Sequence, residues 1–480
     1  MTAASARDRN SWVLAALAAA AAAAALVRDV PAAAVIWVAA AAAVAAFYFL
    51  ARPAAWTWWF VFAGLLLPPL PLTIAGVELP FHPAMAVFAA GLLVIWVRLG
   101  EWRIERGPVA TASALLLGAS LVSLPWTLYY SNAGVAGQSF IRWVLLASGF
   151  VLMFWLAGGP LDADWDHAPL LRMILAAALV TAVFAVIDFQ YQLPRSVRFS
   201  EQYIYGGQTA PVRRAQGVFY DASALGNFCA MMLTFILALG RDARRALRLP
   251  AWLLWTPVPA LALALVLSFS RGSLASLIVA LGALAWMRRG TLRLRSMAML
   301  VALIAAIAVT GLLVAPDLLL PYGSRLQYSV TAFFANPNEV LSQRLDTWTN
   351  LGAFILDHPA QIILGIGYKS LPYTNYFARP MVADNMYLAM LMETGVPGLF
   401  ALLAFCSAVL AWSRRLAHAE RDDLAGLGRF LFCFWLGEMV QMLSGDILTF
   451  WRVTAVYLAI LGVAFRESRR AARRQIPGIG

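Results

Sequence analysis

The sequence predicts an all-α, polytopic membrane protein. Of its 480 residues, 62% are hydrophobic and only 12% are charged, whereas soluble domains have roughly 45–50% apolar and about 25% charged residues. The mean hydropathy is +0.75, and the apolar residues form long continuous runs. This composition excludes an intrinsically disordered chain and argues strongly against a soluble multidomain enzyme.

Apolar runs that could cross a bilayer as helices recur along the whole chain. A span needs about 20 mainly apolar residues, and we predict about 14 such helices in a single transmembrane domain over residues 1–480. We interpret the first run as a span rather than as a cleaved signal peptide, because many further spans follow it. The predicted spans are residues 11–28, 31–51, 55–75, 82–99, 109–127, 139–157, 169–190, 217–240, 251–270, 271–288, 296–315, 383–413, 427–446 and 451–466.

The positive charges predict the orientation of these spans. The formal net charge is +12, which by itself would suit a nucleic-acid partner, but the arginines cluster in short loops between apolar runs. Such clusters mark cytoplasmic loops in polytopic proteins. They occur in alternate loops, including 98–106, 241–248, 288–295 and 414–415, and in the tail after residue 466. We therefore predict that both termini are cytoplasmic.

Two segments on the predicted outer side carry positive charge against this rule. They are the loop at 191–216, with an arginine cluster, and the long segment at 316–382. Since charge there works against the topology, a negatively charged ligand on the outer face is the natural explanation. The charges concerned are Arg195, Arg198, Arg213 and Arg214 in the first segment, and Arg325, Arg344, Lys369 and Arg379 in the second.

The segment 316–382 is too long for a plain connection and predicts an amphipathic helix of its own. Apolar residues recur at helical spacing over 341–356. We expect this helix to end near Asp357, because Pro359 disfavours helical geometry at the residue before it. Arg344 lies on this helix, where it either faces an anion or simply forms part of a solvated face.

Two arginine motifs point to phosphate chemistry. Arg213 and Arg214 precede a span on the outer side, and Arg271 follows Ser270 in a turn between two spans. Guanidinium groups bind phosphate oxygens in a bidentate manner, and a helix start adds free N–H groups and a positive dipole end. The sequence therefore predicts a pyrophosphate-binding site. The alternatives are contact with lipid headgroups for the first motif and an interfacial anchor for the second.

A third polar motif opens a later span. A glycine turn is followed by Asp384 and Asn385, and a carboxylate there could accept a proton from a hydroxyl group. Asp384 could equally cap the helix. His358 is either a base or, as the residue before a proline, a structural group.

Ionisable residues also lie within spans or near their ends, where a functional role is the default hypothesis. The alternative for each is an ion pair between helices or a side chain that reaches the interface. These residues are Arg142, Asp188, Glu438, Asp446 and Arg452.

Together these motifs resemble the superfamily of O-antigen ligases and Wzy-type polysaccharide polymerases. The resemblance covers roughly residues 205–400, and its specificity comes from the order and spacing of short motifs. The motifs are Arg214 with Gly217, Ser270-Arg271-Gly272, Arg344 with Trp348, His358-Pro359 with Gly365 and Gly367, and Asp384-Asn385 with Tyr387, Leu388, Glu393, Gly395 and Gly398.

The resemblance implies a GT-C-like membrane glycosyltransferase with a large periplasmic loop, located in the bacterial inner membrane with its active site facing the periplasm. It implies transfer of glycan from an undecaprenyl-pyrophosphate carrier to an acceptor hydroxyl, with inversion and without metal or cofactor. The expected partners are the lipid-linked oligosaccharide, an acceptor glycan, membrane lipid and a chain-length regulator. No nucleic-acid partner is expected.

The resemblance also implies roles for individual residues. It matches Arg214, Arg271 and Arg344 to arginine positions of the family, and we place Arg214 and Arg271 in catalysis. Asp384 is our candidate base on chemical grounds, because a carboxylate can take the proton of a hydroxyl. The wider set expected to bind pyrophosphate or glycan is Arg213, Arg214, Arg271, Arg344, Asn385, Tyr387 and Arg142.

One departure from the family pattern bears on the acceptor. O-antigen ligases typically have a histidine immediately before the asparagine, where this chain has Asp384. The departure favours a Wzy-type polymerase, which joins lipid-linked repeat units. Ligation to lipid A-core and O-linked protein glycosylation stay open as alternatives, and a transporter or flippase of lipid-linked sugars is the alternative from another class.

Overall fold

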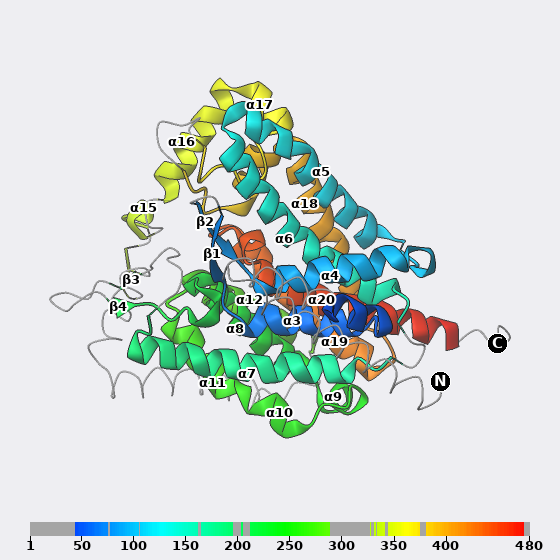
Figure 1. Ribbon diagram of the computed structural model, residues 1–480. Coiled ribbons are helices and arrows are strands. Elements are labelled where there is room, and N and C mark those ends of the chain that lie inside the picture. Colours follow the sequence, from blue (N-terminus) through cyan, green and yellow to red (C-terminus); the bar gives the residue numbers. More distant parts are fainter. Residues whose placement is uncertain are drawn as a thin grey trace, which may run out of the picture. The chain divides into compact units, whose positions relative to one another are not determined.

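A computed structural model of the chain (Figure 1) describes residues 44–74, 77–104, 106–161, 165–194, 203–204, 212–288, 327, 331–332, 334–340, 344–374 and 381–474. The predicted spans at 11–28 and 296–315, and most of the one at 31–51, lie outside these residues. So do Arg195, Arg198, Arg325 and Arg379. The chain divides into two compact units, Met1–Arg103 with Gly158–Trp165 and Ile104–Ala157 with Asp166–Gly480.

In the described part of the first unit, residues 44–51 are helical and two further helices are joined by a β-hairpin. Its elements are α3 (Ala55–Leu66), β1 (Leu70–Ile74), β2 (Val77–Phe81), α4 (Pro83–Val97) and the short η1 (Leu99–Glu101). His82 fixes the start of α4, because its Nδ1 accepts the Ala84 N–H at 3.2 Å while its Nε2 lies 3.0 Å from the Leu67 carbonyl oxygen. Helices α3 and α4 pack against each other.

The second unit is built almost entirely of helices. Four described helices are long and apolar enough to cross a membrane, namely α5, α6, α7 and α18. The prediction of a helical membrane protein is therefore confirmed, whereas the count of about 14 spans stays a prediction. The elements are α5 (Pro108–Tyr130), α6 (Ala133–Gly158), α7 (Ala168–Tyr191), β3 (Tyr203–Ile204), β4 (Val212–Arg213), η2 (Gly217–Phe219), α8 (Ala222–Ala238), α9 (Arg241–Ala246), α10 (Ala251–Trp255), α11 (Pro257–Leu267), α12 (Arg271–Met287), α15 (Pro337–Val340), α16 (Arg344–Asp357), α17 (Pro359–Leu364), α18 (Met386–Leu416), α19 (Asp422–Gln441), η3 (Ile447–Thr449) and α20 (Trp451–Arg474).

Helices α8, α12 and α18 begin in the same way. Each is preceded by a residue with positive φ, which are Tyr220 (58°), Phe269 (51°) and Asp384 (45°). The next residue then caps the helix with its side chain, and these caps are Asp221, Ser270 and Asn385. Such caps satisfy backbone N–H groups that have no partner inside the helix. Each of the three polar sequence motifs thus lies at a helix N-terminus.

Helix α18 is broken one third of the way along. Gly395 has φ 72° and ψ −172°, and Pro397 follows it. Because proline has no N–H, the carbonyl of Glu393 loses its partner four residues on and instead accepts the N–H of Gly367 at 2.9 Å. The glycine turn after α17 is therefore held against the break, and Gly365 allows the contact: a Cβ there would lie 2.3 Å from the Glu393 carbonyl oxygen.

Helix α16 packs onto this arrangement. It ends at Asp357, and its Leu351 is completely buried in a small core with residues of the 366–371 turn and the start of α18. The indole of Trp348 donates to the Ala383 carbonyl oxygen at 2.8 Å. The beginning of the predicted helix, at 341–343, lies outside the described residues.

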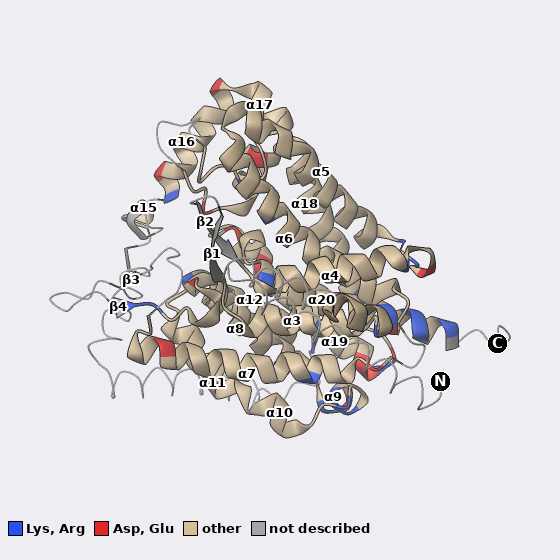
Figure 2. Cartoon of the chain, in the orientation of Figure 1, with Lys and Arg blue, Asp and Glu red and all other residues tan. Residues whose placement is uncertain are grey.

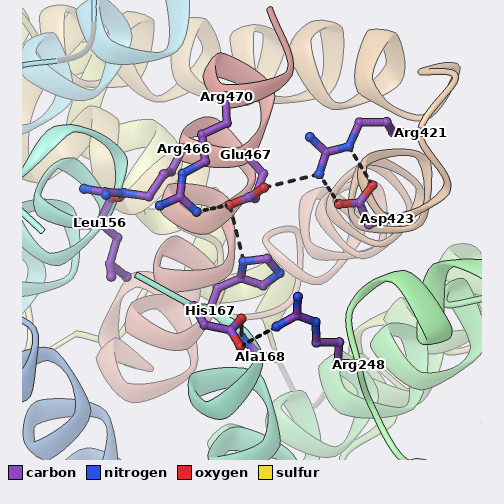
Figure 3. A network of polar contacts seen from close by, with 10 residues as sticks. Leu156, His167, Ala168, Arg248, Arg421, Asp423, Arg466, Glu467 and Arg470 are labelled. Carbon is purple, nitrogen blue, oxygen red and sulfur yellow. Dashed lines mark hydrogen bonds and ion pairs between the residues drawn. The ribbon is translucent and has the colours of Figure 1, made fainter. Parts of the chain in front are cut away.

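Charged residues gather at helix ends and leave the middles of the helices apolar (Figure 2). One such group surrounds Glu467 on α20 (Figure 3), which contacts Arg421 at 3.2 Å, Arg470 at 2.7 Å and His167 at 3.4 Å. Burial raises the pKa of Glu467, but the imidazole of His167 and the guanidinium of Arg470 together lower it from 4.5 to about 2. Glu467 is therefore a carboxylate at neutral pH, at the end of the chain that we predict to be cytoplasmic.

Candidate functional site

Arg214 and Arg271 flank the same turn, between α11 and α12. The Nε of Arg214 donates to the Ser268 carbonyl oxygen at 2.7 Å, and the neighbouring Ala215 N–H donates to Leu267 at 3.0 Å. Arg271 is the first residue of α12, directly after the cap Ser270. Both arginine side chains are half-buried. The two predicted arginine motifs are thus brought to one place, because α11 and α12 both pack against α8, the helix that follows Arg214.

Short contacts connect this turn with the start of α8 and the end of α19. A Cβ on Gly226 would lie 2.7 Å from Ser268 Oγ, and one on Gly272 would lie 2.9 Å from Ser444 Oγ. The Met386 N–H, at the start of α18, donates to the Met442 carbonyl oxygen at 2.8 Å. The N-termini of α8, α12 and α18 therefore lie at one end of the second unit, where their positive dipole ends favour an anion.

Asp384 forms an ion pair and does not cap α18. Its Oδ2 lies 3.2 Å from Arg344 Nε, and the side chains of Asp384 and Arg344 are 44% and 26% exposed. The cap is Asn385, whose Oδ1 accepts the Leu388 N–H at 3.1 Å. The alternative of a capping Asp384 is therefore wrong. Tyr387, the third predicted residue of this motif, donates its hydroxyl to the Met439 carbonyl oxygen at 2.9 Å.

Arg213 and Arg142 are each held by a contact with another side chain of the protein. Arg213 is buried and binds Asp188 at the end of α7, with Nη2 2.8 Å from Oδ1. This contact is the ion pair that was one alternative for Asp188. Arg142 on α6 bonds the Tyr373 hydroxyl, and its guanidinium carbon lies 4.3 Å from the centre of that ring. Arg142 therefore lies beside the 366–374 turn.

His358 has a structural environment. Its ring stacks on Phe354, with 4.2 Å between the ring centres and 17° between the planes. Its Nδ1 lies 3.2 Å from the Phe354 carbonyl oxygen. These contacts favour the structural alternative for His358 over the role of base.

A buried group of charges at the break of α18 was missed by the sequence analysis. Lys369 is 2% exposed and pairs with Asp446, while the Oε1 of the buried Glu393 accepts the Leu371 N–H at 3.3 Å. Burial raises the pKa of the nearby Tyr368 well above its usual range, and the two carboxylates raise it further. The sequence does show that Glu393 and Asp446 each lie within a predicted span. It gives no indication that either carboxylate lies close to Lys369.

A second buried polar group, in the middle of the bundle, was also missed. The amide of Asn227 on α8 donates to both carboxylate oxygens of Glu438 on α19, each at 2.8 Å. Ser276 on α12 donates to Glu438 at 3.1 Å. Three helices are therefore joined through one buried carboxylate.

The described residues offer no evident metal site. No three carboxylate, imidazole or thiol groups in that part of the chain lie close enough to hold an ion together. Metal independence stays a prediction.

These features define a helical membrane protein with cationic side chains and three helix N-termini at one end. Comparison with known families identifies a more specific class: residues 258–403 match the family model described as O-Antigen ligase. The predicted resemblance to the superfamily of ligases and Wzy-type polymerases is thereby confirmed, and these are membrane glycan-transfer enzymes. The match includes Arg271, Arg344 and Asp384 but not Arg214. No curated protein matches the chain in a sequence comparison.

Proposed function

We propose that the protein is a Wzy-type polysaccharide polymerase of the bacterial inner membrane. It transfers glycan from an undecaprenyl-pyrophosphate donor to a hydroxyl of a lipid-linked repeat unit, at the periplasmic face. The observation that carries this proposal is the meeting of the Arg214–Arg271 turn with the start of α18, which bears the Arg344–Asp384 pair. A cationic binding site for the leaving group thus lies at the same end of the second unit as the carboxylate of Asp384.

The two arginines act on the donor. A guanidinium carries five N–H donors in a planar fork, and each arginine can address two phosphate oxygens. Together with the N-terminus of α12 they stabilise the negative charge that develops on the pyrophosphate as the anomeric bond breaks. Pyrophosphate is a good leaving group, so a strong general acid is not required.

Asp384 acts on the acceptor. Its carboxylate lies against Arg344, with Oδ2 3.2 Å from Nε. When the pyrophosphate binds, it takes up the N–H groups of Arg344, and the released carboxylate accepts the proton of the attacking hydroxyl. The hydroxyl oxygen forms the new glycosidic bond with inversion, and the bond to the carrier phosphate breaks.

The test of the arginines is a pair of alanine variants. Arg214→Ala and Arg271→Ala are expected to abolish polymer while expression stays normal, because loss of one stabilising donor costs about 10²–10³ in rate. Arg245→Ala, an exposed arginine of α9, is the matched control and should leave polymer unchanged. Polymer of wild-type length in either active-site variant would contradict the pyrophosphate role.

The second candidate is ligation of finished polysaccharide to lipid A-core, which the description of the matching family model favours. Reconstitution of the purified protein with lipid-linked repeat units alone separates the two functions. A ladder of longer lipid-linked glycans supports the polymerase. Transfer that occurs only after lipid A-core is added supports the ligase, and glycan on an added pilin would indicate protein glycosylation.

A further inference from the structure

A line of hydrogen bonds runs from the middle of the bundle to the turn before α12. The Asn227 amide, bound to Glu438, also donates to Gln441 Oε1 at 3.0 Å. Gln441 Nε2 then donates to Ser273 Oγ at 3.3 Å, and this hydroxyl lies 2.8 Å from Ser270 Oγ. Ser270 is the cap of α12. The line therefore ends at the residue directly before Arg271.

All five members of this line are buried, with exposed fractions of 0–6%. Polar groups inside membrane-embedded bundles are costly and are usually there for a reason. Holding α8, α12 and α19 together is one such reason, but it requires only Asn227, Ser276 and Glu438. Gln441 accepts one further hydrogen bond from Asn227 and extends the group to Ser273.

The side-chain hydrogen bonds of Gln441 join the buried Glu438 group to the turn. Its Oε1 faces Asn227 and its Nε2 faces Ser273, while its Cγ lies 3.6 Å from the position that a Cβ on Gly272 would occupy. The side chain thus touches α12 at the two residues directly after Arg271. Loss of its N–H would remove one of the contacts that hold the Ser273 hydroxyl, which also donates to the Ser223 carbonyl oxygen at 3.3 Å and lies 2.8 Å from Ser270 Oγ.

We propose that Gln441 is a positioning residue, which holds the Ser270–Ser273 turn so that Arg271 presents its guanidinium to the pyrophosphate of the donor. The inference rests on the proposed function, in which Arg271 binds that group. Gln441 itself does not touch substrate. Its effect passes through Ser273 and the cap of α12 to the direction of the arginine.

The test is the variant Gln441→Leu in the purified full-length protein, reconstituted in lipid. A role in stability alone would reduce the amount of active enzyme and hence the maximal rate, and would leave the donor KM unchanged. A positioning role raises the donor KM and the inhibition constant of inorganic pyrophosphate, each by about fivefold or more, the equivalent of one hydrogen bond. Ser273→Ala, which removes the other end of the same bond, is the second variant and should give the same shift.

The matched control is Thr234→Val on α8. It removes another completely buried hydrogen bond, from Thr234 Oγ1 to the Ala230 carbonyl oxygen at 2.8 Å, in a side chain that is not part of the line. The donor KM and the pyrophosphate inhibition constant should stay at their wild-type values in this variant. An equal shift in Thr234→Val would overturn the positioning role, because the effect would then be a general one.

Arg271→Ala distinguishes the failure of this inference from the failure of the proposed function. Because Arg271→Ala is expected to be inactive, its dissociation constant for inorganic pyrophosphate is measured by calorimetry. If this constant rises in Arg271→Ala while Gln441→Leu and Ser273→Ala show no shift, only the positioning role is overturned. If the constant is unchanged in Arg271→Ala, the pyrophosphate role of Arg271 is refuted and the positioning role with it. A shift in all three variants, with none in Thr234→Val, supports the inference.

Discussion

Replacing Asp384 with asparagine should separate a catalytic role from a structural one. Asp384 has a φ of 45°, in a region that asparagine and aspartate tolerate better than most residues. Asp384→Asn therefore keeps the backbone and the size of the side chain and removes the charge. Alanine is the poorer choice, because it would add backbone strain to the loss of the carboxylate.

The expected effect on stability is small. The ion pair with Arg344 has a separation of 3.2 Å, and its side chains are 44% and 26% exposed. Two unit charges at that distance attract by roughly 1.3 kcal/mol in water, and measured exposed pairs contribute about 0–1 kcal/mol. The free energy of unfolding should therefore fall by at most about 1 kcal/mol.

The expected effect on activity is much larger. A positioned general base contributes about 10²–10⁴ in rate, equivalent to roughly 3–5 kcal/mol of activation free energy. The assay is the initial rate of glycan transfer in reconstituted vesicles, with thermal unfolding measured on the same preparation. Asp346→Asn is the matched control, because Asp346 is a carboxylate on α16, two residues after Arg344, and is expected to have no part in transfer.

Two results would refute the role of base. A rate of Asp384→Asn within about fivefold of wild type lies below the range for a general base. A loss of stability as large as the loss of activity would make Asp384 a structural residue.

Three further variants test the fold. Gly365 has φ 74°, and a Cβ there would lie 2.3 Å from the Glu393 carbonyl oxygen. Gly365→Ala should therefore lower the free energy of unfolding by about 3 kcal/mol, through backbone strain and lost hydrogen bonds. Gly352→Ala is the control, because the space for a Cβ is open there, and equal melting temperatures of the two variants would contradict the close contact at Gly365. Asn385→Ala should cost about 1 kcal/mol as a lost cap, seen as faster hydrogen exchange in the first turn of α18, and unchanged exchange there would argue against the cap. Because the pKa of Glu467 is lowered from 4.5 to about 2, its contribution to stability is present above pH 4.5 and is lost as the pH falls towards 2. Unfolding measured across this range should show a weaker dependence on pH in Glu467→Gln, and an identical dependence would refute the assignment.

Local patterns in the sequence were sufficient for several features. Hydropathy predicted a helical membrane protein, since twenty apolar residues in a row are costly to leave in water. Pro359 predicted the end of α16, because a proline acts on its immediate neighbour. The polar motifs predicted helix starts because their effect, too, is confined to neighbouring residues. The order of those motifs was enough for the resemblance that the family match confirms.

Other features depended on packing between distant parts of the chain. Asp384 and Asn385 are both good capping residues, and only the contact with Arg344, 40 residues away, assigns one to the ion pair and the other to the cap. Arg213 and Arg214 are neighbours in the sequence, yet one faces Asp188 and the other faces the turn before α12.

Hydropathy and local motifs are enough to identify a helical membrane protein with cationic motifs at the starts of particular helices, because those properties depend on neighbours within one helix turn or one span. Which of those motifs meet depends on contacts between helices that are distant in the chain. The pairing of Lys369 with Asp446, and of Asn227 with Glu438, joins residues 77 and 211 positions apart. Such pairs form because a buried charge or amide needs a partner, and the packing of the helices decides which partner is within reach.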